Sequence, residues 1–512
     1  MYWLVYCILG LDLQFFEFKH TKYRLVFLCL LILLAIVLVR LFRRAFVEKD
    51  TFSRRFLLYT GINLAILSVF LLLLWPGTWS WDDIHVLNGT QTYTFLPWQH
   101  FLSSVAIIFS AYLIPSVGGV VTVQVILIAF ISGYVLSLFD TLFLDSDKRF
   151  YRLSLVIADL CFFLPPVLIY NCSKYRNTLC AYLEIFLFAF VVRLVKFPHL
   201  RHPKNYLFVF VLVIVTASWR SENIYYAPIC FFIYLLLVGK KHWKRCFATA
   251  LAACVLVVGI GKYNTSLIGT DDYSVMAVIN QVTVLVRKAV AEADPSTESA
   301  LEKIGNVLDI DRIISESDQS GASLYWDGVT LPYTDEEYKD FISAYIQLIL
   351  KYPGTFLKEC ATTFYDSLGV NDNQNILYRS AISIYKPGTS HHEIWGDDRP
   401  AFNVSLREGT IRLLGGLTKN DEYNLFYHIF SNLIPPMLFS LASLLFFLYK
   451  RKPLPFLISF TILCKVPLIF FTAPGGYFMY YLSIYLFGYL IFFFTLALLF
   501  NRKCKRKEPM VS

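Results

Sequence analysis

The sequence predicts an all-α protein that crosses a membrane many times. Of its 512 residues, 57% are hydrophobic and only 16% are charged, whereas soluble domains contain about 25% charged residues. Apolar runs recur along the chain at lengths that suit spanning helices, which need ~20 mostly apolar residues. Lys and Arg residues collect in the short segments between these runs. This pattern excludes an ordinary soluble protein.

About eleven or twelve apolar runs are expected to span the membrane. Residues 1–16 are an uncertain first span, and they lack the basic start and the cleavage site of a signal peptide. The eleven clearer runs are 24–39, 56–75, 118–144, 153–170, 178–195, 206–218, 225–238, 247–260, 426–449, 454–471 and 478–500, of which those at 206 and 225 are short. The predicted organisation is a transmembrane module (1–261) with an external loop (76–117), a soluble region (262–425), C-terminal transmembrane helices (426–500) and a basic tail (501–512).

Positive residues predict the orientation of these helices, because Lys and Arg resist translocation. Basic clusters lie at 40–55, 147–152, 196–204, 240–245, 450–452 and in the tail. If these clusters are cytoplasmic, the segments outside are 76–96, 171–177, 219–223, 262–424 and 473–477. The net charge of +9 then reflects topology, and we expect no nucleic-acid partner. The sequence thus predicts a multi-pass protein of the cell membrane whose active side is extracytoplasmic.

One further run, 98–114, breaks this alternation. If it crossed the membrane, every later loop would change sides and the basic clusters would face outward. We therefore expect a helix that lies along the outer surface, half buried in the interface and bracketed by Pro97 and Pro115. An ordinary span, with a miscount elsewhere, is the alternative.

The region 262–425 contains no spanning run and is long enough for a small, mostly α-helical domain. A helix is expected over 334–350, with Thr334 as N-cap, acidic residues in its first turn and apolar residues at helical spacing. A second amphipathic helix is expected over 353–368, because a Tyr-Pro pair breaks the first. Residues 388–398 are expected to be loop.

Asp82 and Asp83 are the candidate catalytic residues. They follow the apolar run 56–75 and the helix-breaking pair Pro76-Gly77, so two carboxylates lie just outside the hydrocarbon layer. Adjacent helical residues point about 100° apart, which favours different roles for the two acids. One role is general base; the other is to hold a metal, a helix N-terminus or an acceptor. Alternatively both cap a helix that starts at Ile84. Function is favoured for Asp82 and capping for Asp83.

Short external connectors supply candidate residues for binding the phosphate of a donor. Arg220 suits a phosphate because its planar guanidinium donates two parallel hydrogen bonds, and Glu222 would orient it. An ordinary interfacial ion pair is the alternative. Lys174 and Arg176 go against the positive-inside trend, which favours contact with an anionic headgroup. Ordinary snorkelling to the interface is the alternative there.

His85, His100 and Tyr477 are candidates for shaping a substrate site. The two histidines flank the Asp82 loop, and Tyr477 follows the flexible turn 473–476. An aromatic belt at the membrane surface also explains the tyrosine. No histidine has HExxH or HxH spacing and the 11 cysteines include no CxxC pair, so we expect no metal site and no disulfide framework.

The acidic pair in an early external loop, followed by a surface helix that opens near Pro97-Trp-Gln-His100, resembles the GT-C superfamily of integral membrane glycosyltransferases. More narrowly, Pro76-Gly-Thr-Trp-Ser-Trp-Asp82 with Trp98-Gln-His100 is similar to an uncharacterised, largely Gram-positive bacterial family related to that superfamily. The specific part of the resemblance covers residues 56–144. The chain lacks the His-Pro-Pro sequence usual after the loop, so donor and acceptor stay open.

The resemblance implies that Asp82 is the catalytic acid of the motif, with Asp83 in the second acidic position, and that the sugar donor is a polyprenyl phosphate. Asp82 would deprotonate an acceptor hydroxyl for an inverting attack on the anomeric carbon, while Arg220, Lys174 or Arg176 neutralises the departing phosphate. A divalent cation is an optional partner. A transporter or flippase of lipid-linked glycans, or a polymerase of such glycans, is the main alternative, and transporters place ionisable groups within the bilayer.

Overall fold

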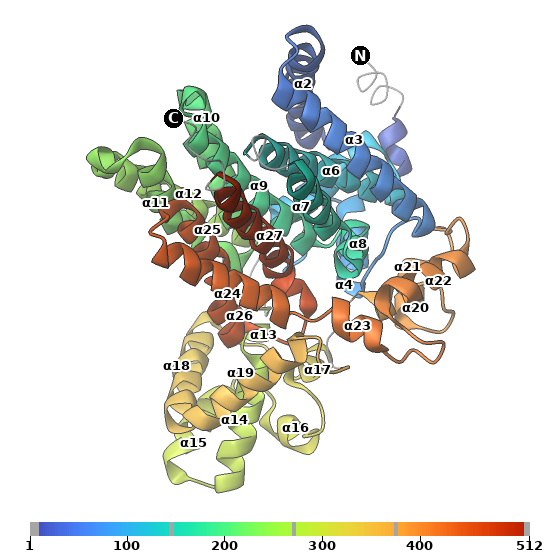
Figure 1. Ribbon diagram of the computed structural model, residues 1–512. Coiled ribbons are helices and arrows are strands. Elements are labelled where there is room, and N and C mark those ends of the chain that lie inside the picture. Colours follow the sequence, from blue (N-terminus) through green and yellow to red (C-terminus); the bar gives the residue numbers. More distant parts are fainter. Residues whose placement is uncertain (1–9, 143–147, 269–272, 373–376, 506–512) are drawn as a thin grey trace. The chain divides into compact units, whose positions relative to one another are not determined.

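The computed structural model describes residues 10–142, 148–268, 273–372 and 377–505, and within these ranges the chain forms helices and no strand (Figure 1). Nine helical stretches in this part are apolar and long enough to cross a membrane. A bent pair, Arg152–Phe163 with Pro165–Asn171, raises the number to ten if it counts as one span. The prediction of an all-α polytopic protein is confirmed.

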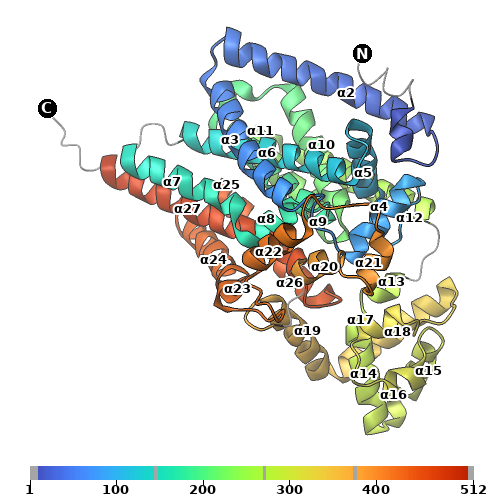
Figure 2. The ribbon, with the colours of Figure 1, turned by 90° about the vertical axis from the view of Figure 1, so that its right-hand side faces the viewer.

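Each of the eleven clearer apolar runs coincides with a helix or with consecutive helices. These are α2 (Thr21–Phe42), α3 (Thr51–Leu73), α6 (Val117–Leu142), α7 (Lys148–Leu160) with α8 (Pro165–Asn171), α9 (Arg176–Lys196), α10 (Pro203–Trp219), α11 (Tyr226–Val238), α12 (Trp243–Ile268), α23 (Leu425–Phe430) with α24 (Ile434–Tyr449), α25 (Pro453–Leu463) with α26 (Lys465–Thr472), and α27 (Leu482–Lys505). α3 and α6 pack along each other, as do α24 and α27 (Figure 2).

The chain divides into two compact units. Unit 1 comprises Met1–Ile268, Ile376–Lys465 and Met479–Ser512, and unit 2 comprises Gly269–Asn375 and Val466–Phe478. The soluble region expected at 262–425 therefore contributes to both units. Its first part forms most of unit 2, and its last part packs with the transmembrane helices of unit 1.

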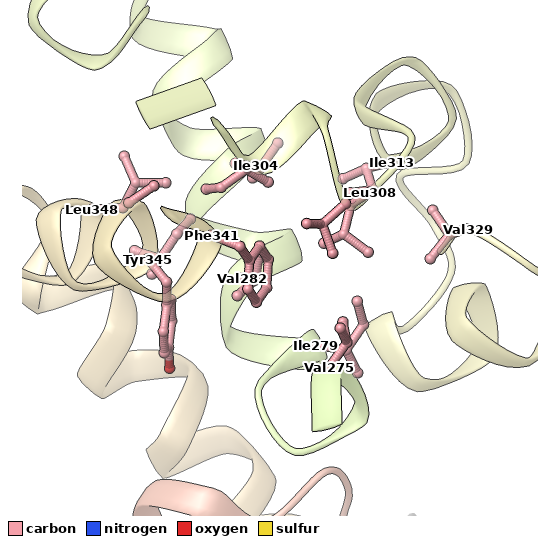
Figure 3. Close-up of a cluster of buried hydrophobic side chains, with 14 of the residues drawn as sticks. Val275, Ile279, Val282, Ile304, Leu308, Ile313, Val329, Phe341, Tyr345 and Leu348 are labelled. Carbon is pink, nitrogen blue, oxygen red and sulfur yellow. The ribbon is translucent and has the colours of Figure 1, made fainter. Parts of the chain in front are cut away.

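Unit 2 is a helical domain with a conventional apolar core. Its helices are α13 (Tyr273–Met276), α14 (Ile279–Glu292), α15 (Glu298–Gly305), α16 (Ile310–Ser315), α17 (Gly321–Trp326), α18 (Asp335–Lys351) and α19 (Pro353–Ser367). Figure 3 shows side chains that these helices and the segments between them direct toward one another, among them Ile279, Val282, Leu308, Phe341 and Leu348. Both predicted helices are confirmed: Thr334 caps α18 in a capping box with Glu337, and Pro353 opens α19.

The last part of the region, in unit 1, forms α20 (Tyr378–Ser383), α21 (Ser390–Trp395) and α22 (Val404–Gly415). The prediction of loop over 388–398 is wrong, because α21 lies there. Thr389 caps this helix by accepting a hydrogen bond from the backbone N–H of His392 at 3.3 Å, and Trp395 is buried against Trp79. Tertiary packing thus stabilises a helix too short to show as a periodic pattern.

Two short helices follow α3: α4 (Trp81–Gln91) and α5 (Phe101–Leu113). α5 has 13 residues and is about 20 Å long, shorter than the ~30 Å hydrocarbon layer, as expected for a helix that does not cross. It is more enclosed than a surface helix, because most of its residues are at least half buried among neighbours that include α4 and α6. Phe16, from the described part of residues 1–16, stacks on Tyr93 after α4; residues 1–9 lie outside the described ranges.

Candidate functional site

α4 begins with a capping box that contains Asp83. Ser80 is the N-cap, its Oγ accepts from the backbone N–H of Asp83 at 3.5 Å, and it donates to Asp83 Oδ2 at 2.9 Å. Asp83 is 2% exposed and also accepts from Ser173 Oγ at 3.4 Å. Burial, and then the charge of Asp82, raises the pKa of the Asp83 carboxyl well above its usual range. The helix starts at Trp81 rather than Ile84, because Ser80 and not an aspartate is the N-cap.

Asp82 has a different environment from its neighbour. It is partly exposed, and the Tyr175 hydroxyl donates to Asp82 Oδ2 at 3.1 Å. Burial, followed by the charges of Asp82 and Asp83, raises the pKa of the Tyr175 phenol well above its usual range, so the phenol stays protonated as a donor. Among the described residues the other Asp82 oxygen has no hydrogen-bond partner. One oxygen is therefore oriented by the protein and the other is left for a ligand.

Four consecutive residues, Ser173–Arg176, donate hydrogen bonds to α4, to α5 and to the segment between these two helices. Ser173 and Tyr175 donate to the two aspartates. Lys174 Nζ donates to Ser110 Oγ of α5 at 3.0 Å, and Arg176 Nη1 donates to the backbone carbonyl of Trp98. Burial lowers the pKa of the Lys174 amine to about 7. We call Ser173–Arg176 the clasp.

Hydrogen bonds to the backbone hold the clasp in place. Gln124 of α6 donates to the carbonyl of Ser173 and, at 3.3 Å, to that of Asn171. The backbone N–H of Thr78 donates to the carbonyl of Cys172 at 2.8 Å. The loop before α4 and the connector before α9 therefore lie side by side.

Arg220, at the end of α10, forms a bidentate ion pair with Glu222. Its Nε donates to Glu222 Oε2 at 2.9 Å and its Nη2 donates to the other carboxylate oxygen. The guanidinium lies over the ring of Tyr480, 5.3 Å from the centroid. The Arg220 side chain is 8% exposed, yet within the described ranges its Nη1 has no hydrogen-bond partner. A buried N–H without an acceptor is costly, so an anionic ligand would bind favourably there.

Residues of the clasp interact both with the surroundings of Asp82 and with those of Arg220. Tyr175 interacts electrostatically with Tyr480, the ring beneath Arg220. Arg176 interacts electrostatically with Glu222. The structure therefore brings predicted site residues from three connectors into one region of unit 1: Asp82, Asp83, Lys174, Arg176, Arg220 and Glu222.

The remaining predicted residues have other surroundings. His85 lies one turn after Asp82 on α4 and packs edge-on against Trp81, with ring centroids 4.1 Å apart. Burial lowers the pKa of His85, against the opposing charge of Asp82. His100 is the N-cap of α5, where its Nδ1 accepts a backbone hydrogen bond at 3.3 Å, and burial lowers its pKa to about 4. Tyr477 belongs to unit 2, whereas the other predicted site residues belong to unit 1.

Arg407 of α22 is a buried residue that the sequence analysis did not identify. Its guanidinium donates to the carbonyls of Leu74 at 3.2 Å, Gly77 at 2.8 Å and Ala381 at 2.6 Å. Burial lowers its pKa to about 10, which leaves it charged at neutral pH. Arg399 donates to a side-chain oxygen of α4 at 2.7 Å. Arg407 therefore fixes the loop that leads to Asp82, and Arg399 fixes α4 itself.

A second group of buried charges lies inside the spanning helices. Lys465 Nζ donates to Glu184 Oε1 and, at 3.0 Å, to Ser483 Oγ, and the two ionic side chains are 5% and 0% exposed. Asn223 Nδ2 donates to the same Glu184 oxygen at 2.8 Å. Asn223 is adjacent to Glu222, so this network also supports the connector that carries Arg220.

Metal-ligating side chains are sparse in the part of the chain that the structure describes, which holds no group of three or more His, Cys, Asp or Glu residues arranged for a metal ion. Asp83 Oδ2 accepts hydrogen bonds from Ser80 Oγ and Ser173 Oγ.

Comparisons of this chain with known protein families, with curated proteins and with solved structures found no match.

Proposed function

We propose that the protein is a membrane glycosyltransferase that moves a sugar from a polyprenyl-phosphate donor to an extracytoplasmic hydroxyl on a glycan, lipid or protein. The observation that carries the proposal is the placement of Asp82, a partly exposed carboxylate held by Tyr175, in the same region as Arg220, whose Nη1 lacks an acceptor. Such a reaction needs a base and an anion-binding group at the ends of spanning helices. The resemblance to the GT-C superfamily also implies that Asp82 is the base.

In this reaction Asp82 takes the proton of the acceptor hydroxyl, and the oxygen attacks the anomeric carbon from the face opposite the phosphate. The bond between the anomeric carbon and the phosphate oxygen breaks, which inverts the carbon and releases a polyprenyl phosphate. Tyr175 orients the carboxylate during the proton transfer. Arg220 balances the negative charge that accumulates on the leaving phosphate.

The contacts divide the predicted cations into two roles. Lys174 and Arg176 already donate to Ser110 and to the Trp98 carbonyl, so we assign them to positioning the Asp82 loop. Arg220 keeps a free donor and is assigned to the phosphate. Asp83 is assigned to the capping box, and His85 to the wall beside Asp82.

A transporter or flippase of lipid-linked glycans is the second candidate. The buried Glu184–Lys465 pair favours it, because ionisable groups inside the bilayer often mark transport pathways. The pair is equally explained as support for the Arg220 connector, through Asn223. The two functions differ in one outcome: a transferase breaks the sugar–phosphate bond and a transporter leaves it intact.

The test uses membranes that contain equal amounts of the parent protein, Asp82→Asn or Asp397→Asn, with radiolabelled sugars on polyprenyl phosphates. Asp397 is the matched control, because its side chain is 95% exposed and outside the site. We expect transfer by the parent and by Asp397→Asn, and a loss of transfer with Asp82→Asn. Movement of intact donor across the bilayer without release of polyprenyl phosphate would instead establish the transporter.

A further inference from the structure

α22 has an unusual distribution of polar and apolar side chains. Its outward face is formed by Phe402, just before the helix, and by Leu406 and Leu413, which are 65%, 53% and 72% exposed. Together with Gly409, these residues follow the 4-3-4 spacing of one helical face, and the face contains no charged residue. Arg407 points the other way and is 2% exposed. A helix in water places its charges outward and its leucines inward, so the exposed Leu406 and Leu413 and the buried Arg407 depart from that pattern.

The apolar face of α22 continues the outer surface of the membrane-spanning helices. α22 packs against α3 and α8, and α3 exposes Val69 and Leu72 in its last turns. Phe402 stacks on Trp75, which directly follows α3, with ring centroids 4.9 Å apart and planes inclined by 10°. Beyond α22, the span that starts at α23 again exposes apolar side chains, Leu425 and Ile429. The face is therefore next to exposed apolar side chains of one candidate span, and the chain continues from α22 into another.

We propose that α22 is an interfacial helix whose Phe402, Leu406 and Leu413 side chains insert among the acyl chains of the bilayer. Its 12 residues are too short to cross a membrane, but they suit a helix that lies in the interface with one face in lipid. The occupant of the face is bilayer lipid, because α22 packs on the candidate span α3 and the chain continues from it into the candidate span Leu425–Tyr449. The inference does not depend on the proposed reaction.

The insertion has a structural consequence for the Asp82 loop. Arg407, on the opposite side of α22, donates to the carbonyls of Leu74 and Gly77 at 3.2 and 2.8 Å. α22 thus links the depth of the bilayer surface to the position of the loop before α4. A lipid-linked substrate would meet Asp82 at a fixed level relative to the membrane.

Three glycines allow a matched test, because a Cβ atom added at Gly61, Gly354 or Gly409 would meet no atom within 4 Å. A fluorescent non-natural amino acid is placed at each site in the full-length protein, which avoids labelling the native cysteines. Gly61 lies in the span of α3 and is the lipid control, whereas Gly354 lies in α19, outside every candidate span, and is the water control. The proteins are reconstituted into phosphatidylcholine vesicles with plain or brominated acyl chains.

We expect brominated lipid to quench the probe at Gly409 nearly as strongly as the probe at Gly61, and to leave the probe at Gly354 unquenched. A probe at Leu413 serves as the second site if the Gly409 variant does not fold. Quenching at Gly409 no greater than at Gly354 would overturn the proposal. That result would mean that the face lies in water or is covered by a second copy of the chain or by another protein.

Discussion

Unit 1 and unit 2 place charged and apolar side chains in opposite ways. In unit 2 the core is apolar, and the ion pair Lys351–Asp294 leaves its side chains 44% and 26% exposed. In unit 1 the pair Lys465–Glu184 is 5% and 0% exposed, whereas leucines such as Leu33 are 59% exposed. Unit 2 has the apolar core of a globular domain, and unit 1 has the buried ion pair and exposed leucines of a polytopic membrane protein.

The difference separates structural charges from candidate functional ones. In unit 2 an ion pair at the surface contributes little, because water and salt screen it. In unit 1 every buried charge must be compensated, so an uncompensated one is informative. Arg220 is paired with Glu222, but its Nη1 has no hydrogen-bond partner among the described residues, and one oxygen of Asp82 likewise has none; both side chains lie beside the clasp.

The largest effect is expected from Lys174→Met, which removes a buried amine from unit 1. Burial lowers the pKa of Lys174 from 10.5 to about 7, so above pH 7 the unfolded state binds more protons than the folded state, and stability rises toward pH 10.5. Replacement by Met should raise the free energy of unfolding at pH 7 by up to about 5 kcal/mol. The gain should shrink to zero near pH 10.5. Thermal unfolding in detergent across this pH range measures it; a gain that is independent of pH would contradict it.

Lys465→Met tests the compensated pair in unit 1. It leaves the Glu184 carboxylate buried without its cation, which should cost about 3–5 kcal/mol of unfolding free energy. Adding Glu184→Gln should recover most of that loss, because the buried charge is then gone. Unfolding of both variants in mixed detergent micelles provides the comparison. A double variant as unstable as the single one would argue that packing rather than charge is responsible.

Tyr175→Phe tests the clasp without removing a charge. The hydroxyl donates to Asp82 at 3.1 Å, and a hydrogen bond to a charged group contributes about 1.5–3 kcal/mol, or roughly 10- to 100-fold in rate. We expect kcat for sugar transfer to fall by this factor with little change in KM for the donor. Tyr365→Phe, at a tyrosine that is 52% exposed in unit 2, is the control. Equal kcat values for parent and Tyr175→Phe would show that the hydroxyl does not orient the base.

The smallest effect is expected from Lys351→Met in unit 2. Lys351 donates to Asp294 at 2.6 Å, but both side chains are partly exposed to solvent. The melting temperature should stay within error of that of the parent, in low and in high salt. A clear loss of stability would mean that this ion pair is sheltered from solvent, and that the contrast between the two units is weaker than the exposures indicate.

Hydropathy and charge were sufficient to predict the spanning helices, and capping signals predicted α18 and α19, because these features are local in sequence. α21 was missed because its six residues depend on burial of Trp395. Tyr175 and the Glu184–Lys465 pair were missed because their partners are 93 and 281 residues away along the chain. For Arg407 one local signal existed: Ile411 and Leu414 share its buried face at helical spacing. The sequence indicated Asp82 as a candidate base and Arg220 as a candidate phosphate-binding residue, but it did not indicate that the two belong to one region.

The most direct test of the role of Asp82 compares the Asp82→Asn and Asp83→Asn variants, each purified in the same way as the parent protein. If Asp82 is the base, Asp82→Asn should lower sugar transfer by at least about 100-fold and leave the melting temperature unchanged. Asp83→Asn should retain transfer, because its amide oxygen can still accept from Ser80 in the capping box of α4 and the residue is not the base. Transfer by Asp82→Asn at the rate of the parent protein would contradict the assignment of the base and, with it, the proposed reaction.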